Sequence, residues 1–349
     1  MSGRQRALAA AVVVATVVAG VLRYATDPGV LSFTVAAIAL AGLAWLVSFG
    51  TEEVGAHYSA AVTGFLQSTL GNLPEFFIVL FALSAGETVV AQTSIIGSLF
   101  ANALLVLGLT IVVGVRSSDD GCMRFGTRLP ADTATLLMVA IFIIVITGLS
   151  VGSADKASDD IKTISAIAAV CILVVYATWA WGYIRSGAGG EGSGHQATVP
   201  LRAAIAILAV AGVGAAFVSD WFIHALDPAI EDLGISKAFA GLVIVAIAGN
   251  AVEHFAAIVL ARKRKYELAV SVVKNSVAQI AAFLFPALVL VSLAFTHTLT
   301  FQLAPIYVGA LFLTALAVWQ ITGDGEAQAF EGWALIALYV MLATFTLYE

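Results

Sequence analysis

The segments GNLPE at residues 71–75 and GNAVE at residues 249–253 repeat one pattern, Gly-Asn-x-x-Glu, inside two long apolar runs. The chain of 349 residues around them is 61% hydrophobic and 11% charged, with a mean hydropathy of +1.01. Soluble domains carry about 25% charged residues, so this chain has too little charge to cover a surface that faces water. A bilayer supplies the missing solvent, and at roughly 20 apolar residues for each spanning helix the length allows about ten to twelve spans.

Apolar runs separated by polar, Gly or Pro residues predict eleven membrane-spanning helices. They cover residues 8–25, 30–51, 57–84, 88–114, 130–150, 161–184, 201–228, 236–261, 267–294, 303–321 and 332–348. The first run follows Arg4 and Arg6 as in a signal peptide, but further apolar segments succeed it, so we interpret it as a spanning helix. The predicted fold class is an all-α polytopic membrane protein.

A Gly/Ser-rich linker lies near the middle of the sequence, at residues 185–200. Of the Lys and Arg residues, 11 lie on the same side of the predicted helices as the N-terminus and 4 on the other side. Because positively charged loops stay in the cytoplasm, we expect the N-terminus inside and the C-terminus outside. An extra helix in residues 1–28 then precedes two five-helix halves of opposite orientation, residues 29–184 and 201–349.

The two halves share polar landmarks at matched spacing. In each half an acidic pair precedes the motif glutamate by 21 to 23 positions, and a polar step ending in Ser begins 22 positions after it. The landmarks are Glu52-Glu53, Glu75 and Gly97-Ser98 in the first half, and Glu231-Asp232, Glu253 and Asn275-Ser276 in the second. In a chain so poor in polar residues this agreement indicates an inverted repeat, a common plan of secondary transporters whose site lies near the bilayer midplane.

The two motifs are expected to interrupt their helices. Gly weakens a helix and Asn competes for its backbone hydrogen bonds, and Pro74 removes a further backbone donor from the first motif. An interrupted helix frees carbonyl oxygens, which is tolerable in a membrane only where they face protein or a polar cavity. The site residues predicted from the motifs are Gly71, Asn72, Glu75, Gly249, Asn250 and Glu253.

The predicted site offers only oxygen ligands, from carboxylates, amides and freed carbonyls, and such a set suits Ca²⁺. An intramembrane carboxylate is costly and therefore indicates a function by default. Glu75 and Glu253 would repel each other, and burial disfavours their charged form, so their affinity for protons is expected to rise. One Ca²⁺ or about two protons would then neutralise the pair. The alternative, that each glutamate is a helix-packing residue, is disfavoured by the two matched copies.

Other polar residues near the motifs have two interpretations each. Ser98, Ser276 and Gln279 either complete the site or hold helices together, and for Asn102 we favour packing. The acidic residues Glu52, Glu53, Glu231 and Asp232 either attract cations at the two entrances or are ordinary solvated helix ends.

Two basic side chains lie close to the second motif in the sequence. We expect Lys274 to point away from the site, because a fixed positive charge there would weaken the binding of a divalent ion. His254 directly follows Glu253, and on a helix it points roughly 100° away from it, so we expect it to support the ligands or to pack between helices rather than to bind the ion directly.

The segments GNAVEH at 249–254, GNLPE at 71–75 and GSLFANALLVLG at 97–108 together resemble the Ca²⁺/H⁺ exchangers, the CAX branch of the Ca²⁺:cation antiporter superfamily. The stretch GLVIVAIAGNAVEHFAAIVLARK at 241–263 is the most specific part. The resemblance runs from about residue 31 to residue 294, and the last two helices match by position only.

The resemblance implies a ten-helix exchanger core behind an extra first helix. Glu75 and Glu253 would be the carboxylates that bind the ion and carry protons. Sodium-exchanging relatives commonly place Ser or Thr where this chain has Asn72 and Asn250, so the resemblance points to protons as the counter-ion.

Three departures from the family pattern stand out. The first motif reads LPE where the family often has ATE, and Lys274-Asn275-Ser276 stands where a Gly-Ser pair is usual. The central linker lacks the acidic segment that many relatives carry, which suggests a shorter, prokaryote-like form.

Other functions remain alternatives to Ca²⁺/H⁺ exchange: a Na⁺/Ca²⁺ or Na⁺/H⁺ exchanger, or a cation channel. Channels often build selectivity from rings of subunits, whereas here one chain supplies two inverted halves. An enzyme is not expected, because no Ser–His–Asp or HExxH arrangement lies at membrane depth. We expect a multi-pass protein of a prokaryotic plasma membrane that moves Ca²⁺ and H⁺, with Na⁺ as the alternative ion and with no cofactor and no nucleic-acid partner.

Overall fold

The computed structural model describes residues 2–58, 70–185 and 197–349, and the described chain is almost entirely helical. The first half contains α1 (Gly3–Ala25), α2 (Val30–Gly55), α4 (Leu73–Ser84), α5 (Thr88–Phe100), the π-helical η1 (Ala101–Val106), α6 (Leu107–Ser117), α7 (Arg128–Gly152), the 3₁₀ turn η2 (Lys156–Asp160) and α8 (Ile161–Arg185). The second contains α9 (Leu201–His224), α10 (Leu226–Leu233), α11 (Lys237–Phe239), the π-helical η3 (Ala240–Val245), α12 (Ala246–Arg262), α13 (Tyr266–Gln279), the π-helical η4 (Ile280–Leu284), α14 (Phe285–Ser292), α15 (Pro305–Thr322) and α16 (Ala329–Leu347).

Ten helices or continuous helical runs of the described chain are long and apolar enough to cross a membrane. The remaining predicted span, residues 57–84, falls partly outside the described residues and contains the shorter apolar helix α4. The other predicted spans are present, most with ends within a few residues of those predicted. The predicted polytopic α-helical fold is therefore confirmed.

The predicted seventh span, residues 201–228, is wrong at its end. Helix α9 stops at His224, and a separate helix, α10, begins at Leu226. Pro228 accounts for the stop, because proline lacks the backbone N–H that would bond to the His224 carbonyl, whereas in the first turn of a new helix no such donor is needed.

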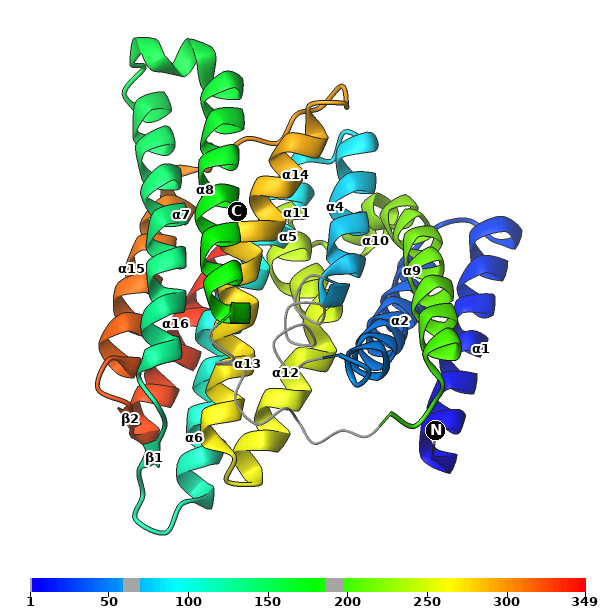
Figure 1. Cartoon of the computed structure of the whole chain (residues 1–349). Helices are drawn as coiled ribbons and strands as arrows, with labels where there is room; N and C mark the ends of the chain where they lie inside the picture. The colour runs from blue at the N-terminus through cyan, green and yellow to red at the C-terminus, as the bar shows by residue number, and fades with distance from the viewer. Residues whose placement is uncertain (1, 59–69, 186–196) are drawn as a thin grey trace.

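Helices far apart in the sequence lie side by side. Figure 1 shows α2 and α9 packed together at one edge of the molecule, with α1 on their outer side. At the opposite edge α7 packs against α8 and α15. Phe33 of α2 stacks on Phe222 of α9 with 4.6 Å between the ring centroids. The helices α4, α5, α12 and α13 lie between these edges and form the centre that holds the two motifs.

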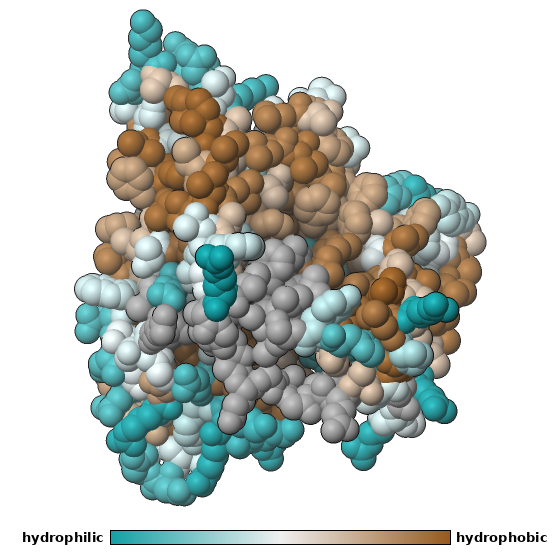
Figure 2. All heavy atoms as spheres, viewed as in Figure 1, coloured by the Kyte–Doolittle hydropathy of each residue, from teal (hydrophilic) through white to brown (hydrophobic). Residues whose placement is uncertain are grey.

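The outer faces of the helices are apolar. Large hydrophobic side chains such as Phe142 on α7, Val210 on α9 and Leu313 on α15 are exposed. Figure 2 shows brown side chains over the helix flanks, with hydrophilic residues gathered toward the ends. An apolar surface of this extent is unusual for a soluble protein and fits a lipid surrounding.

Two glycines allow α5 to cross the start of the η3–α12 helix at very close range. A Cβ atom on Gly97 would lie 2.4 Å from the Leu242 carbonyl oxygen, and one on Gly241 would lie 2.1 Å from Oγ1 of Thr93. Small residues at such crossings let helix backbones approach each other in a membrane. The crossing fixes the position of Ser98, the next residue on α5.

Two π-helical turns mark equivalent places in the two halves. The Gly71–Gly249 offset of 178 positions carries η1 (Ala101–Val106) onto residues 279–284, where η4 (Ile280–Leu284) is found. Each turn follows the helix that carries the polar-Ser step of its half. Since π turns are rare and concentrate at functional sites, this correspondence supports the repeat beyond the sequence landmarks.

A small sheet is an addition to the predicted all-α fold. The strand β1 (Met123–Arg124) pairs antiparallel with β2 (Glu326–Ala327), which joins the loop before α7 to the loop before α16. At the same end of the molecule Arg264 pairs with Asp119 at 2.7 Å, and this hydrogen bond holds the pKa of Asp119 below its usual range. Both partners are exposed, so the pair adds little stability.

Candidate cation site

The first Gly-Asn pair separates two helical segments. Residues 70 and 71 are helical, Asn72 leaves the helix at φ −87° and ψ 12°, and α4 begins at Leu73. Pro74, in the first turn of α4, has no N–H to bond back to residue 70. The predicted interruption of the first helix is therefore confirmed.

The predicted interruption of the second helix is wrong. Helix α12 runs from Ala246 to Arg262 without a break through Gly249 and Asn250. No proline follows this pair, and one Gly costs a helix only about 1 kcal/mol, which packing can offset. The Asn250 side chain donates from Nδ2 to the Ala246 carbonyl at 3.0 Å and so stays bonded to its own helix. The irregularity of this helix lies earlier, in the π-helical turn η3 (Ala240–Val245).

The two motifs meet, and each glutamate lies against the glycine of the other motif. A Cβ atom on Gly249 would lie 2.8 Å from Cγ of Glu75, and one on Gly71 would lie 3.0 Å from Oε1 of Glu253. Both glycines thus leave room for a carboxylate side chain from the other half. The structure brings Glu75 and Glu253 together at the centre of the molecule, as the repeat predicts.

Glu75 is buried, 3% exposed, and held by side chains from two other helices. Its Oε1 accepts hydrogen bonds from the Ser98 hydroxyl on α5 and from Asn250 Nδ2 on α12, the latter at 2.7 Å. Asn250 Nδ2 also lies 2.9 Å from Ser98 Oγ. The second carboxylate oxygen, Oε2, is buried and has no hydrogen-bond partner among the described residues.

The Glu253 carboxyl group has fewer hydrogen-bond partners than that of Glu75 among the described residues. Its Oε2 is buried and lacks a hydrogen-bond partner in the described chain. Ser276 of α13 lies beside the carboxyl group, but its hydroxyl makes no hydrogen bond of good geometry there. The two halves are therefore unequal: Glu75 is anchored on one oxygen, whereas the carboxyl group of Glu253 and its neighbouring hydroxyl keep unused bonding capacity.

The remaining predicted residues lie close to this centre. Asn72 is buried at the start of α4, and Gln279 is buried at the end of α13, directly before η4. Asn102 donates from Nδ2 to the Ser98 carbonyl at 3.0 Å and so supports α5 from within its own helix. This bond agrees with the packing role expected for Asn102.

The four acidic residues that precede the motifs do not share one environment. Glu52 on α2 and the α10 residues Glu231 and Asp232 are exposed. Glu53 is fully buried, and its carboxylate accepts hydrogen bonds from the Thr198 N–H at 2.7 Å, the Thr198 hydroxyl at 2.6 Å and the Val199 N–H at 3.1 Å. Glu53 therefore ties the end of α2 to the start of α9, which corrects its placement at an entrance. No local sequence pattern predicts this contact, because Thr198 and Val199 lie 145 and 146 positions away from Glu53 along the chain.

Lys274 points away from the two glutamates, as expected. It lies two positions before Ser276, which puts it on the opposite side of α13, and it lines a pocket formed with α7 and α15. His254 is buried on α12, and its Nε2 has no hydrogen-bond partner among the described residues.

The arrangement can hold a hard cation or protons. In the described chain there is no group of three or more His, Cys, Asp or Glu side chains that could hold a metal, so the two carboxylates must act with amide and hydroxyl groups. Each half supplies one buried carboxylate oxygen without a hydrogen-bond partner among the described residues, and such oxygens favour a positive charge beside them. Either a divalent cation or protons would neutralise the two carboxylates.

Comparison with known proteins places this chain in a family. The model of the family described as "Sodium/calcium exchanger protein" matches twice, over residues 28–183 and 203–348. The chain belongs to this family. Each match covers one of the two halves, and each half contributes one Gly-Asn-x-x-Glu motif.

Similar proteins include named Ca²⁺ transporters. The vacuolar calcium ion transporter of Schizosaccharomyces pombe is 31% identical over 323 residues, covering 88% of this chain and 77% of the relative. The Ca²⁺/H⁺ antiporter ChaA of Bacillus subtilis is 30% identical over 330 residues, covering 90% and 92%. The solved structure of native YfkE superposes with a TM-score of 0.81 at 29% identity, covering 98% of this chain and 99% of that one. The predicted membership of the Ca²⁺/H⁺ exchangers is confirmed.

Proposed function

We propose that this protein is a secondary transporter that exchanges Ca²⁺ for H⁺ across a membrane, at a site built on Glu75 and Glu253. The observation that carries this proposal is the reciprocal contact of the motifs, in which each glutamate lies against the glycine of the opposite half. The names of the similar proteins support the same pair of ions and a transport activity rather than an enzymatic one.

The exchange follows from competition between Ca²⁺ and protons at one pair of carboxylates. With both glutamates charged, the site carries two negative charges away from water, and one Ca²⁺ compensates them at once. When Ca²⁺ leaves, protons on the same carboxylates restore neutrality. A protein that opens this site to one side at a time then couples the movement of Ca²⁺ to the opposite movement of protons.

The side chains around the two glutamates have different roles. Ser98 and Asn250 donate to Glu75 Oε1, and donors to a carboxylate favour its charged form and fix its position. Oε2 of Glu75 and Oε2 of Glu253 are then left to meet the cation or the protons. We assign supporting roles to Asn72, Ser276 and Gln279, which line the same centre.

The proposal is tested with the purified protein in proteoliposomes that contain a pH-sensitive dye and no sodium. A Ca²⁺ gradient is expected to drive proton movement in the opposite direction, and a proton gradient to drive Ca²⁺ movement. A response to Na⁺ with no response to Ca²⁺ would favour the alternative, a Na⁺/H⁺ exchanger, and Ca²⁺ flux that requires Na⁺ would favour a Na⁺/Ca²⁺ exchanger. Ca²⁺ flux that needs no counter-ion would indicate a channel.

Substitution of either glutamate should abolish exchange. Glu75→Gln and Glu253→Gln keep the side-chain shape but remove the negative charge that compensates Ca²⁺ and the group that carries the proton. We expect Ca²⁺-driven proton flux to fall to the background of protein-free liposomes in both variants. Asp160→Asn, which changes an exposed carboxylate in η2, is the matched control and should retain full flux.

We further propose that the protein lies in the plasma membrane of a prokaryote, with its N-terminus in the cytoplasm and its C-terminus outside. The distribution of Lys and Arg between the loops supports this orientation, and a bacterial relative supports the source. Green fluorescent protein fused to the C-terminus should then be dark, whereas alkaline phosphatase fused there should be active. The reverse pair of results would invert the topology.

The division into residues 1–28, 29–184, 185–200 and 201–349 also belongs to this proposal. The two separate family matches begin and end close to the boundaries of the two five-helix halves. An outer position of α1, against α2 and α9, supports its being an addition to the core.

A further inference from the structure

A second unusual charge lies within the helical bundle, away from the cation site. Lys274 on α13 is 3% exposed, yet it makes no hydrogen bond and no ion pair with the described residues. A lysine within a membrane-spanning helix is costly and rarely lacks a partner. Its surroundings therefore favour an anion that the described residues do not provide.

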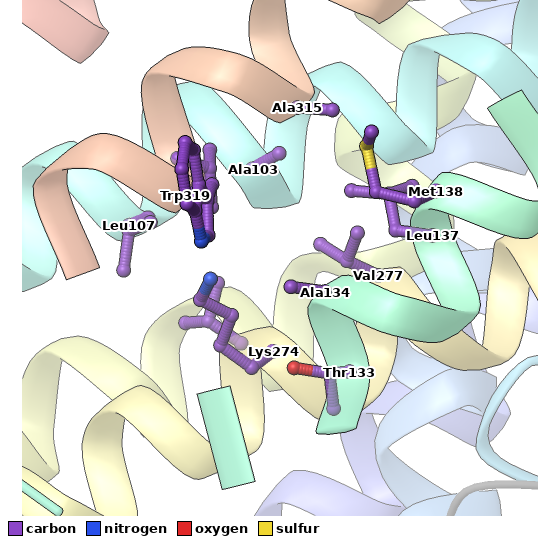
Figure 3. A pocket seen from close by; sticks show the side chains of 12 residues that line it. Ala103, Leu107, Thr133, Ala134, Leu137, Met138, Lys274, Val277, Ala315 and Trp319 are labelled. Atoms are coloured by element: carbon purple, nitrogen blue, oxygen red, sulfur yellow. The ribbon is translucent and has the colours of Figure 1, made fainter. Parts of the chain in front are cut away.

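Lys274 forms part of the wall of a pocket between four helical segments. The pocket is small and partly open to the surface, and it is lined by residues of η1–α6, α7, α13 and α15. Figure 3 shows Lys274 and Thr133 pointing into it, with Trp319 opposite the lysine. Apart from these three residues the lining is apolar, including Leu137, Met138 and Val318.

The pocket opens toward the surface that would contact lipid. Met138 of α7 and Trp319 of α15, at its rim, are 41% and 60% exposed. A long apolar chain entering between these two side chains would reach the apolar wall without crossing the protein. The cation site is not reached from here, because the lysine projects from the side of α13 opposite Ser276.

The pocket lies within reach of the ends of its helices. Lys274 lies eight residues after the start of α13 at Tyr266, about 12 Å along the helix, and a lysine can extend several ångströms back toward the interface. Trp319 lies three residues before the end of α15, and exposed tryptophans favour the membrane–water interface. The run Arg262–Lys265 adds positive charge at the same end.

We propose that this pocket binds one acidic phospholipid. Its phosphate group pairs with the Lys274 ammonium group beside the Thr133 hydroxyl, and one acyl chain lies against Leu137, Met138 and Val318. The lipid supplies a counter-charge for Lys274 and covers the apolar wall, and both gains occur only in the folded protein. Basic pockets between spanning helices suit acidic headgroups for the same reason.

The test measures the thermal unfolding of the full-length protein in detergent, with dioleoyl-phosphatidylglycerol or dioleoyl-phosphatidylcholine added to the micelles. At saturating lipid we expect phosphatidylglycerol to raise Tm by about 4 °C more than phosphatidylcholine does. In Lys274→Gln this difference should vanish, and in Lys274→Arg it should persist. Lys263→Gln, which removes a charge from the exposed basic run, should keep the full difference.

A second variant tests the shape of the pocket independently of the charge of Lys274. Ala134→Phe narrows the pocket at its lining but leaves Lys274 in place, and it should also lose the phosphatidylglycerol effect. Inorganic phosphate at the same concentration should not reproduce the shift, since it lacks the acyl chain. Equal stabilisation of wild type by the two lipids, or an undiminished phosphatidylglycerol effect in Lys274→Gln or Ala134→Phe, would overturn the proposal. A shift by phosphate alone would reassign the pocket to a free anion.

Discussion

Asn250 is the side chain through which the second motif reaches the glutamate of the first. Its Nδ2 atom lies within hydrogen-bond distance of Glu75 Oε1, Ser98 Oγ and its own helix at Ala246. An amide donor favours the charged form of a buried carboxylate without adding a positive charge of its own, whereas a lysine at this place would add one. The side chain therefore helps to hold Glu75 ready for a cation, while the continuous helix α12 fixes the amide.

Removal of this donor should weaken Ca²⁺ binding. Hydrogen bonds to charged groups are worth about 1.5–3 kcal/mol, so Asn250→Ala should raise the Ca²⁺ concentration for half-maximal transport by about 10- to 100-fold. Asn102→Ala is the control, because Asn102 bonds to the Ser98 carbonyl and not to Glu75. An unchanged Ca²⁺ dependence in Asn250→Ala would contradict the role given to this amide. Flux assays over a range of Ca²⁺ concentrations measure both variants.

The motif glycines should be intolerant of a single methyl group. In Gly249→Ala the new Cβ would meet Glu75 Cγ at 2.8 Å and displace the carboxylate, at a cost of about 1–3 kcal/mol. We expect transport to fall by about tenfold or more while the protein remains folded. Gly309→Ala in α15, where a Cβ meets nothing within 4 Å, is the matched control. Equal transport by the two alanine variants would show that the glutamate does not need this space.

At the scale of single elements, the helix breaks at the first motif but continues through the second, and the sequence explains only the break. Pro74 forbids the backbone bond that would carry a helix through Asn72, so the break in the first motif was predictable. In the second motif Gly249 and Asn250 are also poor helix formers, but tertiary packing overrides their weak preference and α12 continues. The helix propensities of single residues do not predict tertiary packing, so they could not predict that α12 continues through its Gly-Asn pair.

The crossing of α5 with the start of the η3–α12 helix should tolerate no side chain at its centre. A Cβ on Gly97 would lie 2.4 Å from the Leu242 carbonyl oxygen, which belongs to a backbone that cannot rotate away. Gly97→Ala should therefore lower the free energy of unfolding by about 3 kcal/mol, although the same change on an open helix face is favourable. Thermal unfolding in detergent, with Gly309→Ala as the reference, measures the difference. A Tm equal to that of Gly309→Ala would contradict the close crossing.

At the scale of the whole molecule, hydropathy predicts the approximate bounds of the ten spanning helices found in the described residues, because each must be apolar along its length. The matched spacing of polar landmarks predicts which helices are equivalent, and η1 and η4 confirm it. Neither hydropathy nor landmark spacing predicts contacts between distant loops or pockets formed by distant helices. The β1–β2 pairing, the Glu53–Thr198 bonds and the Lys274 pocket each join segments more than 100 positions apart without any local pattern.

The most direct test of the account measures the affinity of the purified protein for Ca²⁺ by titration at several pH values. If Ca²⁺ and protons compete at one pair of carboxylates, Ca²⁺ binding must tighten as pH rises, by about tenfold per pH unit for each proton released. We predict a steep dependence for wild type, and for Glu75→Gln and Glu253→Gln much weaker binding with a shallower dependence. A Ca²⁺ affinity that does not change with pH in wild type, or one that depends on pH as steeply in both variants as in wild type, would contradict competition at the Glu75–Glu253 pair.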